Sequence, residues 1–70
     1  MNDMRRKPEN RTWVLVETNE CFLHFAYYQD GMYMIVGISD DWLQPEEFKG
    51  WMSINQLRQS ISLYEFTKHM

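Results

Sequence analysis

Cys21 and His24 are the only thiol and imidazole that lie close together in the sequence. Nucleophilic catalysis by such a pair requires the imidazole within hydrogen-bond distance of the sulfur, and a third group that orients it. Residues three apart in a strand point to opposite faces, which keeps these two side chains apart. We therefore expect Cys21 to be a buried structural residue and His24 to be a half-buried strand residue. With no other catalytic set in view, we expect the protein not to be an enzyme.

Metal and cofactor sites are not predicted either. One Cys and two distant His do not provide a zinc spacing. Carboxylates gather at Asp40, Asp41, Glu46 and Glu47, but they lack the spacing and central glycine of a calcium loop. The three glycines are isolated, so no glycine-rich phosphate loop is present. We expect no metal and no cofactor.

The same acidic segment, residues 39–50, is the strongest functional feature of the sequence. It places large apolar side chains between acidic pairs, and Trp is enriched at the energetic centres of protein interfaces. The predicted partner-binding residues are Asp40, Asp41, Trp42, Leu43, Glu46 and Glu47. The alternative is that Trp42 and Phe48 fold back over the sheet as a lid.

Charge is unevenly distributed along the chain, whose formal net charge is −3. Residues 1–11 carry four basic residues against two carboxylates, and the remainder carries three against eight. An acidic body repels a phosphate backbone. The basic residues that could still contact phosphate are Arg5, Arg6, Lys7 and Arg11. Nucleic-acid binding, with Tyr27 or Tyr33 as stacking platforms, is therefore the second choice.

Length and composition predict one small domain. The chain has 70 residues, of which 44% are apolar and 16% aromatic, enough for a small core. We expect a flexible basic arm over residues 1–11 and a single β-rich domain over 12–70. A single Cys fits a reducing compartment, and no signal peptide or apolar run of membrane-spanning length is visible. These features predict a soluble cytoplasmic protein.

The elements expected over 12–38 form a three-stranded antiparallel meander. Residues 12–18, 21–28 and 32–38 are rich in β-branched and aromatic residues. Asp30-Gly31, between the second and third runs, is a strong hairpin signal. Gly37, inside the third run, suggests a bulge or a bend.

The remainder of the chain predicts a loop, a short helix and a last strand. Pro45 can begin a single helical turn in the loop over 39–50. Residues 51–54 resume an extended run, and Ser53 with Gln56 has capping-box spacing for a short helix through residue 60. Residues 62–67 alternate as an edge strand would. The expected fold class is α+β, mainly antiparallel β, and an SH3-like small barrel satisfies this order of elements.

Both faces of the predicted meander are mostly apolar, whereas a sheet with one wet face alternates apolar with polar residues. Leu23, Phe25 and Tyr27 share one face of the second strand, and Ala26 and Tyr28 share the other. We therefore expect the second face to be closed by barrel curvature, by the rest of the chain, or by a second subunit in a homodimer.

Three short segments resemble a family of small phage and prophage proteins of unknown function. The family runs V-L-V-x-T, then an A-Y-Y-D-G-x-W-like hairpin, an acidic loop and a W-M-P-L-P close. Residues 14–18, 26–31 and 51–54 occupy those places, although Ser53 and Ile54 replace the proline-containing close. No activity is known for the family, so the resemblance implies only a mobile-element setting. The resulting hypothesis is a non-catalytic protein-binding module, an accessory or inhibitor protein that engages a host protein.

Overall fold

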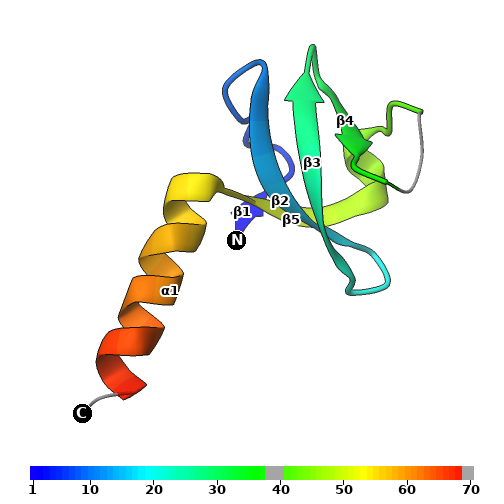
Figure 1. Cartoon of the computed structure of the whole chain (residues 1–70). Helices are drawn as coiled ribbons and strands as arrows, with labels where there is room; N and C mark the ends of the chain where they lie inside the picture. Colours follow the sequence, from blue (N-terminus) through cyan, green and yellow to red (C-terminus); the bar gives the residue numbers. More distant parts are fainter. Residues whose placement is uncertain (38–40, 69–70) are drawn as a thin grey trace.

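A computed structural model describes residues 1–37 and 41–68, with side chains through residue 63. Its strands form one antiparallel sheet in the order β1-β5-β2-β3-β4, and the only α-helix in the described part of the chain follows the last strand (Figure 1). The elements are β1 Asn2–Asp3, β2 Thr12–Thr18, β3 Leu23–Gln29, β4 Met32–Ile35, the 3-10 helix η1 Pro45–Glu47, β5 Phe48–Ser53 and α1 Ile54–Lys68. The α+β, mainly antiparallel fold class is thereby confirmed.

The β3–β4 hairpin turns at Asp30-Gly31, as predicted. Both turn residues have positive φ, 52° and 83°, which is the backbone of a type I′ turn and suits the twist of the strands. The Asn10 side chain accepts a hydrogen bond from the Asp30 backbone N–H at 2.8 Å. The N-terminal segment is therefore tied to the tip of this hairpin.

The strand predicted over 32–38 is shorter in the structure. β4 ends at Ile35, and Gly37 has a φ of 78°, so the chain leaves the sheet in a turn. The helical turn predicted at Pro45 is confirmed as η1. β5 then pairs with β2, and Lys49 forms a bulge, because Glu17 is opposite Gly50 whereas Thr18 is opposite Phe48.

The capping box at the start of α1 is confirmed. The Ser53 backbone N–H donates to Gln56 Oε1, and the Gln56 backbone N–H donates to Ser53 Oγ, both at 3.0 Å. The helix does not end near residue 60, and the edge strand predicted over 62–67 is wrong, because α1 continues to Lys68. No Gly or Pro interrupts residues 54–68. Within the described residues, no helix combines the length and apolarity that a membrane span requires.

One face of the sheet carries the core. Its buried side chains are those of Val14, Val16, Ala26, Tyr28, Tyr33, Ile35, Phe48 and Trp51. The rings of Tyr28, Tyr33 and Phe48 pack in sequence, with centroids 4.9 and 5.3 Å apart. Met4 and Leu43 pack against this cluster from the N-terminal segment and the loop.

The SH3-like barrel expected from the sequence does not form. β1 and β4 lie at opposite ends of the strand order, and no ladder joins them within the described residues. Barrel curvature therefore does not close the second face.

Residues 1–11, for which we expected a flexible arm, contact the sheet. Asn2 and Asp3 pair with Trp51 and Gly50 as β1, and Pro8 is buried. The Trp51 indole Nε1–H donates to the Arg6 carbonyl at 2.7 Å. The segment thereby crosses the core side of the sheet.

Candidate protein-binding surface

The sheet face opposite the core is apolar and largely open, and we call it the outer face. Strand alternation and register place its side chains together, because directly paired residues of antiparallel strands share a face. Leu15 is opposite both Phe25 and Met52, and Tyr27 is opposite both Trp13 and Met34. The outer face consists of Trp13, Leu15, Leu23, Phe25, Tyr27, Met32, Met34 and Met52, with two polar members, Glu17 opposite Leu23 and Gln29 opposite Met32.

Three of these side chains remain more than half exposed. Trp13 and Phe25 each keep 51% of their surface in water, and Leu23 keeps 57%. The Trp13 and Tyr27 rings pack edge to face with centroids 5.1 Å apart. A fixed aromatic cluster of this kind presents apolar area with little conformational entropy left to lose on binding.

Trp42 extends the outer face at the hairpin end. Leu43 forms two backbone hydrogen bonds with Tyr33, of 3.0 and 2.6 Å, and packs against the core. Since neighbouring residues of an extended segment point to opposite sides, Trp42 lies on the outer side. It lines a shallow pocket there with Gln29 and Met32.

The acidic loop therefore divides into two parts. Leu43, predicted to bind a partner, packs against the core. Of the two side chains in the lid alternative, Phe48 is buried in the core and Trp42 is exposed. Asp41, Trp42, Glu46 and Glu47 are exposed. The Glu47 carboxylate accepts a hydrogen bond from the Gln44 backbone N–H at 3.0 Å, which anchors η1. Asp40 lies outside the described residues.

Cys21 and His24 form no catalytic pair. Cys21 is exposed in the β2–β3 turn, with a φ of 71°, so its expected burial is wrong. The Lys49 ammonium donates to Cys21 Sγ at 2.8 Å, and this hydrogen bond raises the pKa of Lys49. His24 is half-buried, as predicted. No group of three or more potential metal ligands occurs in the part of the chain that the structure describes.

Of the two tyrosines suggested as stacking platforms, Tyr27 is half-buried on the outer face beside Trp13, and Tyr33 is buried. Arg5 binds the Asp3 carboxylate at 3.2 Å, and this hydrogen bond lowers the pKa of Asp3. Arg6, Lys7 and Arg11 are exposed. Tyr33, suggested as a stacking platform, is only 1% exposed and cannot receive a base.

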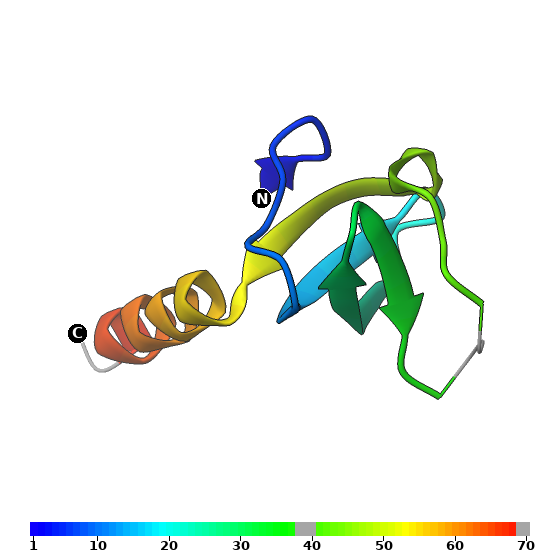
Figure 2. The same cartoon turned by 90° about the horizontal axis from the view of Figure 1, so that it is seen from above.

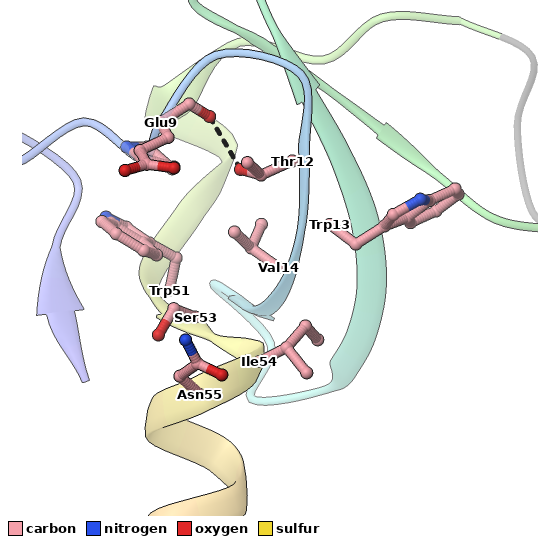
Figure 3. Close-up of a pocket in the computed structure, with 9 residues that line it drawn as sticks. Glu9, Thr12, Trp13, Val14, Trp51, Ser53, Ile54 and Asn55 are labelled. Atoms are coloured by element: carbon pink, nitrogen blue, oxygen red, sulfur yellow. Dashed lines mark hydrogen bonds between the residues drawn. The ribbon is translucent and has the colours of Figure 1, made fainter.

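A pocket of about 420 Å³ lies on the core side, next to the start of α1. Figure 3 shows Val14 and Trp51 lining it, whereas Trp13 points away from them across β2. Its hydroxyl groups are already engaged, because Thr12 donates to the Glu9 carbonyl and Ser53 accepts from Gln56. The pocket offers no nucleophile paired with a base.

No family model matches this chain, and no curated protein and no solved structure matches it. The resemblance to phage and prophage proteins therefore stays a prediction from the sequence.

The outer face was only partly accessible to sequence analysis. The apolar alternation of residues 12–18 and 21–28 predicts a second apolar face, but it does not say which face the chain itself covers. The N-terminal segment, with no periodicity of its own, decides that by crossing the core side.

Proposed function

We propose that this chain is a non-catalytic protein-binding domain and that the outer face is its binding surface. The observation that carries this proposal is the exposure of Trp13, Leu23 and Phe25 on the same face of a regular sheet. A fully buried aromatic side chain removes roughly 150–250 Å² from water, so covering the exposed half of Trp13 or Phe25 contributes about 2 kcal/mol. A partner that covers several such side chains gains enough for specific association.

Of the predicted partner-binding residues in the acidic loop, Trp42 borders this surface. Glu46 and Glu47 lie toward the core side instead, where they line a pocket with Leu43 and Phe48. The resemblance to mobile-element proteins makes a host protein one candidate for the partner, and a second copy of this chain is another.

Affinity capture from a bacterial lysate followed by reconstitution with the purified partner tests the proposal. Phe25→Glu places a charge at the centre of the outer face, and Lys7→Gln changes the net charge equally at an exposed site on the N-terminal segment. We expect the purified partner to bind wild type and Lys7→Gln equally, and Phe25→Glu at least about tenfold more weakly. Equal binding by the Phe25 variant, with its fold intact by circular dichroism, contradicts the proposal.

A further inference from the structure

Helix α1 projects from the sheet instead of covering it (Figures 1 and 2). Its 15 residues extend about 22 Å, and its main contacts with other elements go to β2 and β5, the two strands beside its first turn. An isolated helix of this length is marginal in water, because helices in proteins gain most of their stability by packing an apolar stripe. The side chains of residues 58–63 are all exposed, so this part of α1 lacks the support that such a helix needs.

α1 carries a short apolar stripe. Ile54, Leu57 and Ile61 follow the i, i+3, i+7 spacing that places side chains on one face of a helix. Ile54 and Leu57 are half-buried near the sheet, but Ile61 keeps 50% of its surface exposed. The stripe thus begins in contact with the domain and continues into solvent.

The chain cannot bring this helix over its own outer face. α1 begins at Ile54, immediately after β5 ends at Ser53, and no connecting loop allows it to reverse. The reciprocal hydrogen bonds between Ser53 and Gln56 fix the junction. One molecule therefore holds two apolar surfaces that it cannot join.

The size of the molecule agrees with a missing partner. Its radius of gyration is 13.0 Å, against about 11 Å for a compact chain of this length. Its accessible surface is 5362 Å², roughly 700 Å² more than a compact 8.6 kDa monomer exposes. A standard interface buries about 800 Å² on each partner. The excess area is close to what one side of a stable dimer needs.

We infer that the partner of the outer face is a second copy of this chain, whose α1 lies across the face and whose own outer face receives α1 in return. This inference rests on the proposed function, since it names the protein that the outer face binds. Five strands span about 19 Å, so the helix is long enough to cross the sheet. Exchange of the same element in both directions is a two-fold, self-complementary contact, the commonest kind in homo-oligomers.

Light scattering and sedimentation equilibrium of the full chain test this arrangement. We expect a species of twice the 8.6 kDa of one chain. Phe25→Glu alters the outer face, and Ile61→Lys alters the helix stripe at an exposed position. Gln59→Lys adds the same charge on the opposite side of α1 and is the matched control. We expect each of the first two variants to weaken dimerisation at least about tenfold, and the control to leave it unchanged.

Mixing the two weakened variants gives the most specific result. A heterodimer of Phe25→Glu with Ile61→Lys keeps one intact helix-to-face contact and pairs the new charges in the other, so the mixture should dimerise more tightly than either variant alone. If Phe25→Glu loses dimerisation but Ile61→Lys does not, the two outer faces pair with each other and the helix exchange is overturned. A wild-type chain that stays monomeric at all concentrations would also overturn it.

The two proposals fail in different ways. If wild type is monomeric but a different protein binds it through Phe25, the helix exchange is refuted and the protein-binding function stands. If wild type is monomeric and nothing binds through Phe25, both are refuted.

Discussion

Gly50 allows β1 to lie against β5. A Cβ atom built at this position would be 2.8 Å from the Asn2 carbonyl oxygen and 3.3 Å from Met1 Cβ. The Asn2 carbonyl belongs to the backbone and cannot rotate away as a flexible side chain can. Any larger residue at position 50 must therefore displace β1. A glycine is therefore needed at position 50 because the neighbouring backbone leaves no room for a methyl group.

Gly50→Ala should lower the free energy of unfolding by about 1–3 kcal/mol, because overpacking forces a backbone shift. Urea denaturation measures this change, and limited proteolysis should show faster cleavage within residues 1–7. Gln59→Ala, at an exposed position on α1, is the control. An unchanged urea midpoint for Gly50→Ala would show that β1 contributes nothing to stability.

Tyr33 links the stability of the core to alkaline pH. Burial, with a smaller effect of the nearby Tyr28, raises the pKa of Tyr33 to about 12. The same phenol titrates near 10 in an unfolded chain. Between these values the unfolded chain binds fewer protons than the folded one, so the free energy of unfolding should fall as pH rises from 10 to 12. Urea midpoints across this range should fall steeply for wild type and less steeply for Tyr33→Phe. Identical slopes would be inconsistent with a neutral buried Tyr33.

At the scale of elements, one glutamine joins the beginning of α1 to the edge of the sheet. Gln56 Oε1 accepts hydrogen bonds from the Ser53 backbone N–H at 3.0 Å and from Asn2 Nδ2 at 2.7 Å. The helix cap and β1 are thereby fixed by the same side chain.

Gln56→Ala should destabilise the helix start by about 0.5–1.5 kcal/mol, the usual net contribution of a hydrogen bond, because the Ser53 backbone N–H loses its acceptor. Hydrogen exchange of the first-turn amides measures the change, and Gln59→Ala, an exposed substitution three residues further along α1, is the control. Equal exchange in both variants would mean that the Gln56 side chain does not hold the junction.

The elements that sequence analysis predicted well are those with a local cause. Asp30-Gly31 and the Ser53–Gln56 box specify their turns with two or four residues, and both are present. The strand predicted over 62–67 is wrong because alternation in a short apolar stretch also fits a helix, and only the capped start upstream decides between them. β4 ends at Ile35, before the turn in which Gly37 has a positive φ, and this reason is likewise not visible in the alternation.

The binding surface depends on the whole molecule and could be predicted only in part. Trp42 was predicted as a binding residue from its type, and the pairing of Leu43 with Tyr33 places it beside the outer face. Trp13, Leu23 and Phe25 carried no such signal, because an apolar residue in a strand faces a core as often as a partner. Their exposure follows from the N-terminal segment, which covers the opposite face.

The central claim is that a protein covers the outer face, and photo-crosslinking from Phe25 tests it most directly. The photoreactive analogue p-benzoylphenylalanine replaces Phe25 in one preparation and the exposed Lys7 in a matched one, and both are irradiated in a bacterial lysate. The account predicts a discrete adduct from position 25 that is absent from position 7, with the added mass of a second copy of the chain or of one other protein. The claim is contradicted if the adducts from position 25 are no more abundant and no more discrete than those from position 7.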